Sequence, residues 1–144
     1  MTIEDDDELR EILTSSKTVA CVGVSTNPEK PSYGIFAYLL EQGYDMIPVN
    51  PGASEIQGRR SFPDLASIPQ KVDVVQVFRK PEDVPAVVEQ AIRIGVMVVW
   101  MQEDVINPEA ALTAESAGLK VVMNRCMRKT HVRLLGGRAR SQPQ

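Results

Sequence analysis

The sequence has few of the residues from which covalent cross-links, metal sites and acid–base catalysts are built. Among its 144 residues are two cysteines, one histidine and one tryptophan. Cys21 and Cys126 lie far apart and form no C-x-x-C pair, so we expect neither a structural disulfide nor a zinc site. Sparse, unpaired cysteine is typical of proteins in a reducing compartment.

Charge and hydropathy exclude two further classes of partner. The chain carries 16 Lys and Arg against 19 Asp and Glu, a formal charge of −3, so it has no overall positive field that would attract nucleic acid. The first residues, MTIEDDDE, are acidic where a signal peptide needs basic ones, and no apolar run is long enough to span a membrane. We therefore expect a cytoplasmic protein with no nucleic-acid or membrane partner.

Short apolar segments alternate with helical patterns along the chain. This alternation predicts a single α/β domain with a Rossmann-like, doubly wound, mostly parallel sheet. The strands are expected at residues 18–23, 45–49, 72–78, 96–101 and 120–123, and the helices at 33–42, 82–94 and 108–117. A short strand near Ile56 and a short helix near Leu65 are also expected. The predicted organisation is an N-terminal helix within residues 1–16, the α/β domain over 17–135 and a disordered tail over 136–144.

The loop after the first predicted strand is suited to an anion. In open α/β sheets the ligand lies beyond the carboxyl ends of the strands, so strand-end residues are the first candidates. Gly23 permits a sharp turn and close approach of a ligand to the backbone, and Ser25 can donate to phosphate oxygens. Lys30 adds a cation to the same loop. Ser32 is predicted to cap the helix that follows.

Other strand ends argue against a nicotinamide dinucleotide. The chain has no G-x-G-x-x-G motif, and Asn50-Pro51 stands where an acidic residue would hold the ribose. Arg79 and Lys80 follow the strand that begins at Val72, and two cations there suit a ligand with extra phosphate charge. Solvated surface charge is the alternative interpretation of this pair.

Taken together, these strand-end segments resemble the stand-alone CoA-binding protein family. That family is similar to the N-terminal CoA-binding domain of the succinyl-CoA synthetase alpha subunit. The resemblance extends from Lys17 to about Leu134 and rests on the order of its segments. The matching segments are TVACVGVS at 18–25, Lys30, VNP at 49–51, QG at 57–58, VFRKP at 77–81, WMQ at 100–102 and NRC at 124–126.

The resemblance implies that the cofactor is coenzyme A or an acyl-CoA. The resemblance also implies that the phosphates face Gly23, Val24, Ser25 and Lys30. The nucleotide is flanked by Asn50 and Pro51 and by Phe78, Arg79, Lys80 and Pro81. The pantetheine arm lies beside Met101, Gln102 and Glu103. Backbone donors and cations fit the phosphates, and an apolar surface fits the adenine.

No set of residues in the sequence points to catalysis. The phosphohistidine of the synthetase belongs to a domain absent here, and His131 lies outside any catalytic pattern, so a surface or packing role is expected for it. Glu103 and Asp104 are interpreted as charges at a helix start. We therefore expect non-catalytic binding of CoA. The alternatives are a component of a CoA-thioester enzyme that needs a partner subunit, or a NAD(P)-binding regulator, and a homo-oligomer is possible.

Two further side chains have competing interpretations. Cys126 follows a strand-end Asn-Arg pair, and Arg125 would favour its thiolate, so a mixed disulfide with the CoA thiol is one hypothesis. The other is that Cys126 is a small buried apolar residue. Trp100 is expected to be a core or rim residue rather than a stacking platform.

Overall fold

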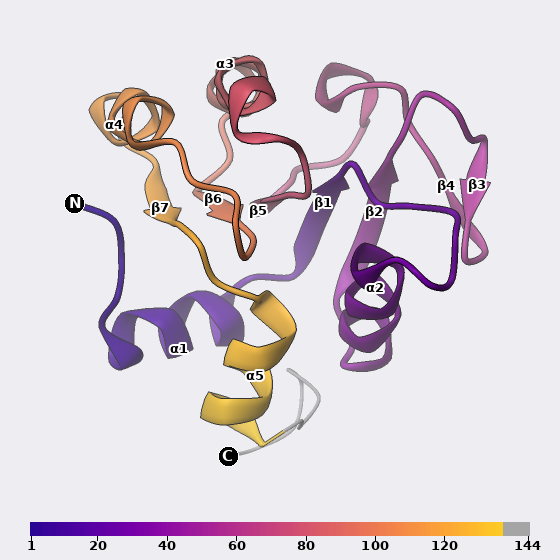
Figure 1. The fold of residues 1–144 in the computed structure, drawn as a ribbon, viewed down its shortest axis with the longest axis horizontal. Helices are drawn as coiled ribbons and strands as arrows, with labels where there is room; N and C mark the ends of the chain where they lie inside the picture. Colours follow the sequence, from indigo (N-terminus) through magenta and orange to yellow (C-terminus); the bar gives the residue numbers. More distant parts are fainter. Residues whose placement is uncertain (137–144) are drawn as a thin grey trace.

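A five-stranded parallel sheet forms the centre of the computed structural model, which describes residues 1–136 (Figure 1). The strands lie in the order β2-β1-β5-β6-β7, and every neighbouring pair is parallel. Their bounds are β1 Thr18–Val22, β2 Asp45–Val49, β5 Val74–Val77, β6 Val98–Met101 and β7 Lys120–Val122. The predicted Rossmann-like α/β fold is confirmed.

Helices cover both faces of the sheet (Figure 1). One face is covered by α1 (Asp6–Ser15), α2 (Pro31–Glu41) and α5 (Met127–Leu135), and the other by α3 (Val84–Ile94) and α4 (Pro108–Ser116). The region after β2 holds a hairpin of β3 (Glu55–Ile56) and β4 (Arg59–Arg60), and the 3-10 turn η1 (Leu65–Ser67). A second 3-10 turn, η2 (Pro81–Asp83), leads into α3.

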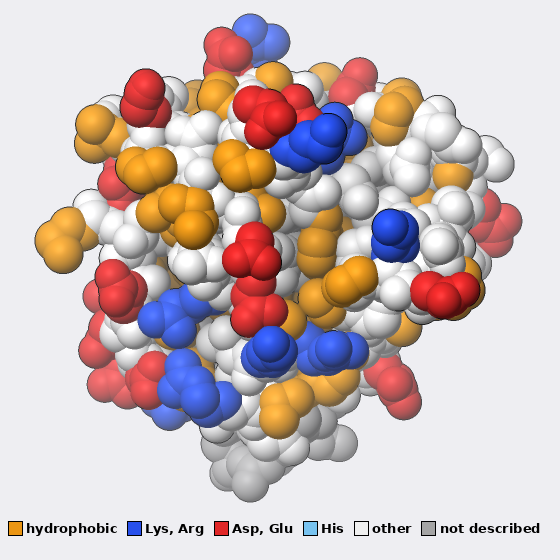
Figure 2. All heavy atoms as spheres, in the orientation of Figure 1, with side chains coloured by type: hydrophobic (Ala, Val, Ile, Leu, Met, Phe, Trp, Pro, Cys, Tyr) orange, Lys and Arg blue, Asp and Glu red, His pale blue; other side chains and the backbone are white. Residues whose placement is uncertain are grey.

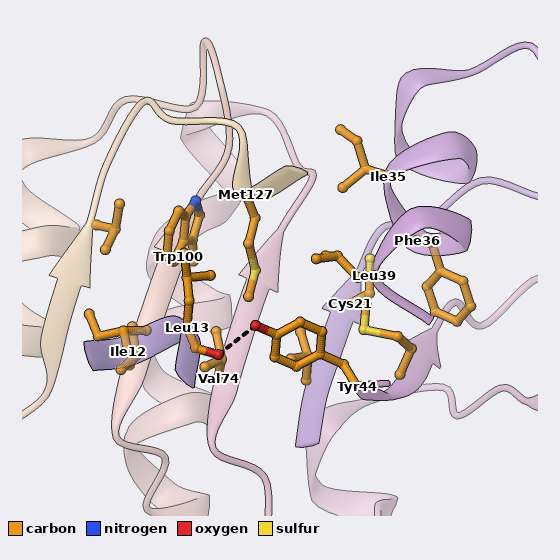
Figure 3. Close-up of a cluster of buried hydrophobic side chains, with 14 of the residues drawn as sticks. Ile12, Leu13, Cys21, Ile35, Phe36, Leu39, Tyr44, Val74, Trp100 and Met127 are labelled. Carbon is orange, nitrogen blue, oxygen red and sulfur yellow. Dashed lines mark hydrogen bonds between the residues drawn. The ribbon is translucent and has the colours of Figure 1, made fainter. Parts of the chain in front are cut away.

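Side chains of each strand point alternately into two apolar cores, as a sheet buried on both faces requires. Cys21, Val74 and Trp100 belong to the core under α1, α2 and α5, where Tyr44 donates a hydrogen bond to the Leu13 carbonyl (Figure 3). Their neighbours along the strands, such as Val75, face α3 and α4. This alternation determines which side chain at each strand end points toward α2 and α5.

The helix α5 was not predicted from the sequence. It begins after Cys126, whose sulfur is 3.5 Å from the Lys129 amide nitrogen, and it ends at Gly136 in a left-handed conformation. Asp6 of α1 accepts two hydrogen bonds from Arg133 of α5, each 3.0 Å long. The predicted disordered tail lies outside the described residues apart from Gly136.

The N-terminal segment adds to the edge of the sheet. The amide of Ile3 donates to the carbonyl of Val121 in β7 at 2.8 Å, so residues before α1 cover part of an otherwise open strand edge. None of the helices within residues 1–136 has the length and apolar character needed to cross a membrane.

Candidate functional site

The loops after β1 and β5 meet at the point where the strand order reverses. The chain leaves β1 for β2 on one side, and β5 pairs with β1 on the other, which is where open α/β sheets hold ligands. Gly23 has φ +89°, and its amide donates to the Val49 carbonyl at 3.0 Å. A Cβ atom at Gly23 would lie 2.5 Å from the Phe78 carbonyl oxygen. The two loops are therefore in direct backbone contact.

Asn50 fixes the position of the first loop from the end of β2. Its Nδ2 donates to the Val24 carbonyl at 3.0 Å, and its Oδ1 accepts the Gly52 amide at 2.8 Å. Both ends of the side-chain amide are thus engaged within the protein. Asn50 holds the loop that lines the site, and Val24 in this loop is fully buried.

The prediction that Ser32 caps α2 is wrong. The helix begins at Pro31 after Lys30, whose side chain makes no capping hydrogen bond. The Ser32 hydroxyl instead accepts the Ser25 amide at 2.9 Å and ties the loop to the first turn of the helix. Because Pro already satisfies the first helical position, the serine one residue later is free to bind the loop. The α2 N-terminus therefore faces the crevice without a capping side chain, a favourable position for an anion.

Two cavities open on either side of this junction. The first, of about 600 Å³, lies between the start of α2 and the loops after β5 and β6, and the second, of about 570 Å³, lies between the ends of β1 and β2 and the start of α3. Gly23, Ser25 and Arg79 line both. The two cavities therefore adjoin at these three residues.

Charged groups surround both cavities. Lys30, Arg79 and Lys80 line the first, and Arg79 forms an ion pair of 3.2 Å with Asp83. Acidic and basic side chains lie close together over the middle of the face shown in Figure 2, with apolar side chains exposed between them. The cations that line the first cavity suit an anionic group of a ligand, whereas Asp64, Glu82 and Asp83 give the second cavity acidic side chains beside Arg79.

The structure brings together all the predicted site residues except one. The first cavity is lined by Gly23, Ser25, Lys30, Phe78, Arg79, Lys80, Pro81, Gln102 and Glu103, and the second by Gly23, Val24, Ser25, Asn50, Pro51 and Arg79. Met101 lines neither, because as a central strand residue it is fully buried in the core under α3 and α4. Strand alternation turns it away from α2, whereas Gln102 lies on the same side as Trp100.

Several lining residues were missed from the sequence. Ile35 and Val105 line the first cavity beside Asp104, and Asp64 and Gln90 line the second. Ile35 lies one helical turn after the Lys30–Ser32 segment, so its face of α2 was available as a signal. Asp64 and Gln90 are far from the site in sequence, and no local pattern marks them.

The remaining candidates lie outside the cavities. Trp100 is fully buried, and its indole nitrogen donates to the Arg125 carbonyl at 2.9 Å, which confirms a core position. His131 is also fully buried and lies 2.8 Å from the Tyr38 hydroxyl. Cys126 is 5% exposed and lines neither cavity, which favours its structural interpretation. Burial raises the pKa of the Cys21 thiol. Within residues 1–136, no group of three or more His, Cys, Asp or Glu side chains is arranged to hold a metal ion.

The fold and the crevice together define a Rossmann-like ligand-binding domain whose site is suited to a phosphate-bearing ligand. Residues 17–131 match the family described as "CoA binding domain". The chain therefore belongs to this family of CoA-binding domains.

Known proteins related to the chain include single-domain proteins and parts of larger enzymes. The uncharacterized protein YneT of Bacillus subtilis is 35% identical over 124 residues, covering 86% of this chain and 92% of the relative. A hypothetical protein from Pyrococcus horikoshii has a solved structure with a TM-score of 0.91 and 46% identity, covering 94% of this chain and 97% of that one. The alpha subunit of ADP-forming acetate–CoA ligase I from Pyrococcus furiosus is 37% identical over 62% of this chain, which covers only 21% of the subunit.

Proposed function

We propose that the protein binds coenzyme A or an acyl-CoA at the junction of β1 and β5 without catalysing a reaction on it. The observation that carries this proposal is the pair of cavities that share Gly23, Ser25 and Arg79. Coenzyme A has a nucleotide half and a pantetheine half joined by a diphosphate. A ligand of this form matches two cavities that adjoin at the turn after β1, beside the N-terminus of α2.

The residues present fit each part of this cofactor. The α2 N-terminus and Lys30 provide donors and positive charge for the diphosphate. Pro51 and Val87 give the second cavity apolar surface for an adenine, and Ile35 and Phe78 give the first cavity apolar surface for the pantetheine arm. The side chains therefore bind and orient the ligand through separate contacts with its two halves.

Calorimetric titration of the purified chain with CoA, acetyl-CoA, NAD and NADP tests this proposal. Binding of a CoA compound without binding of either dinucleotide is the expected result. Tighter binding of NAD or NADP would overturn the proposal. The structure gives a reason to expect weak dinucleotide binding, because Asn50 replaces the ribose-binding acid and both ends of its amide are already engaged.

We expect the two cations after β5 to contact the 3′-phosphate where the two cavities adjoin, because Arg79 lines both cavities and Lys80 lines the first. Replacing Arg79 and Lys80 together by alanine should weaken CoA binding by at least about 10-fold, since charge-assisted hydrogen bonds are lost. The affinity for dephospho-CoA, which lacks the 3′-phosphate, should decrease much less. Titration of the double variant with both ligands measures the difference.

A matched control uses two exposed cations that line neither cavity, Lys71 and Arg93. Replacing both by alanine changes the net charge equally, so any general electrostatic effect appears in both double variants. Equal weakening of CoA and dephospho-CoA by the Arg79 and Lys80 changes would assign these cations to another part of the ligand.

A partner-dependent role in a CoA-thioester enzyme is the second candidate. It is favoured by the similarity to the alpha subunit of an acetate–CoA ligase, of which the chain covers 21%. Turnover of an acyl-CoA by the isolated chain would contradict a purely binding role, and turnover that appears only with an added subunit would support the second candidate.

A cytoplasmic location is also proposed, since both cysteines of the chain are free thiols.

A further inference from the structure

The two ends of the first cavity differ in charge. Lys30 precedes α2 beside β1, Arg79 and Lys80 follow β5, and Glu103 and Asp104 follow β6. In the strand order β1-β5-β6, the first and last of these loops lie two strand spacings apart, about 10 Å. Because cations attract the phosphates, the opposite end of the ligand is directed toward the carboxylates after β6.

Gln102 lines the cavity at this carboxylate end and is 3% exposed. Its Oε1 accepts the Met127 amide at 3.3 Å, while its Nε2 has no hydrogen-bond partner within residues 1–136. Turning the amide over would set Nε2 against the Met127 N–H, placing two donors together, so the first residue of α5 fixes the orientation. A buried donor without an acceptor raises the free energy of the ligand-free protein.

The backbone around Gln102 is held in place before any ligand arrives. Its amide donates to the Val77 carbonyl at 3.3 Å, and its carbonyl accepts the Val105 amide at 2.9 Å. Asp104, two residues further along the loop, has φ +68°, and its amide donates to Asn124 Oδ1 at 2.8 Å. The donor of Gln102 and the carboxylate of Asp104 are thus carried by one preorganised loop.

We propose that the cavity selects a CoA thioester with an uncharged acyl group, and that Gln102 Nε2 donates a hydrogen bond to the thioester carbonyl. The inference rests on the proposed binding of CoA. A thioester carbonyl supplies the acceptor that Gln102 lacks, whereas free CoA ends in a thiol, which is a poor acceptor. The Asp104 carboxylate repels a thiolate or a second carboxylate at this end, while Lys129 offsets the charge of Glu103 at 3.1 Å.

Access to the donor requires a small local movement. Nε2 has no contact with solvent in this structure, so the carbonyl reaches it after a shift of the groups that cover it, a scale of change common on ligand binding. Gln76 is the competing internal partner. Its Oε1 is also buried without a partner among the described residues, and both glutamines contact Met127.

The test compares three ligands on the full chain by calorimetric titration: CoA, acetyl-CoA and succinyl-CoA. We expect acetyl-CoA to bind about 10-fold more tightly than CoA, the effect of one satisfied hydrogen bond. Succinyl-CoA, whose acyl group carries a carboxylate, should bind about 10-fold less tightly than acetyl-CoA. Absence of any CoA binding would overturn the proposed function, whereas binding of CoA without preference for acetyl-CoA would overturn this inference alone.

Two variants of Gln102 identify the donor. Gln102→Met removes both polar atoms at similar volume, and Gln102→Glu keeps an oxygen for the Met127 amide while removing the donor. Each should bring the ratio of acetyl-CoA to CoA affinity to about one. Equal weakening of both ligands, with the ratio unchanged, would assign the donor to the pantetheine arm and overturn the inference.

A third variant and a control complete the design. Asp104→Asn keeps the left-handed backbone, which asparagine tolerates, and should raise succinyl-CoA affinity about 10-fold with little change for acetyl-CoA. Gln76→Met removes the other buried glutamine, which lines neither cavity, and should leave the ratio unchanged. If Gln76→Met also brings the ratio of acetyl-CoA to CoA affinity to about one, the two glutamines act together within the core. That result would contradict a direct contact between Gln102 and the ligand.

Discussion

Gly23→Ala should destabilise the protein by at least about 3 kcal/mol and abolish binding of CoA compounds. The added Cβ would lie 2.5 Å from the Phe78 carbonyl oxygen and 2.9 Å from Arg79 Cδ. Relief of this clash requires that the loops after β1 and β5 separate, which disrupts the part of the site that both cavities share. Chemical denaturation measures the loss of stability, and titration with CoA measures the loss of binding.

Gly118→Ala is the matched control for this change. Gly118 has φ +91°, almost the same as the +89° of Gly23, but a Cβ there would have nothing within 4 Å. Its substitution reports the cost of the left-handed conformation alone, about 1 to 2 kcal/mol. Equal destabilisation by the two substitutions would contradict close packing of the β1 and β5 loops.

The stability of the protein should decrease as the pH falls from about 7 to 5, because His131 is buried as a neutral side chain. Burial lowers the pKa of His131 below its ordinary value, so the unfolded chain binds a proton more readily than the folded one. The stabilisation is therefore complete above the unfolded-state pKa, near 6.5, and is lost as the pH falls toward the folded-state pKa. Denaturation curves at a series of pH values measure this slope.

His131→Phe should remove most of this pH dependence. It retains an aromatic ring beside Tyr38 and Tyr44, whose rings lie 5.5 and 5.9 Å from that of His131. The chain contains no other histidine, and the Asp6 carboxyl, whose pKa the Arg133 hydrogen bond lowers, titrates below this range. An unchanged slope in the variant would show that another group is responsible.

The sequence predicted the sheet and the edge that carries the site, because both follow from local patterns. Runs such as residues 18–23 and 72–78 are mainly apolar and are followed by residues with turn or charge character, so strand ends and candidate site residues were identified together. The parallel arrangement then placed those ends at one edge. Gly23, Arg79 and Gln102 line the cavities for this reason.

The features that the sequence did not reveal depend on contacts between distant residues. The α5 segment, MRKTHVRLL, has basic residues at many positions, and its apolar face is recognisable only against Trp100 and Leu9 of the core. Ser32 is a good capping residue by type, but Ser25 competes for its hydroxyl. Met101 lies within the matching segment WMQ at 100–102, but strand alternation directs its side chain away from the site.

The contact between α1 and α5 also constrains the order of events during synthesis and folding. Arg133 and Asp6 are separated by 127 positions, so their contact requires closure of a loop that includes all five strands of the sheet. During synthesis α1 is made before α5, and its apolar residues Leu9, Ile12 and Leu13 lack that covering helix until residues 127–135 have been made. The nascent chain therefore passes through a stage in which the sheet can form while one of its faces is still partly uncovered.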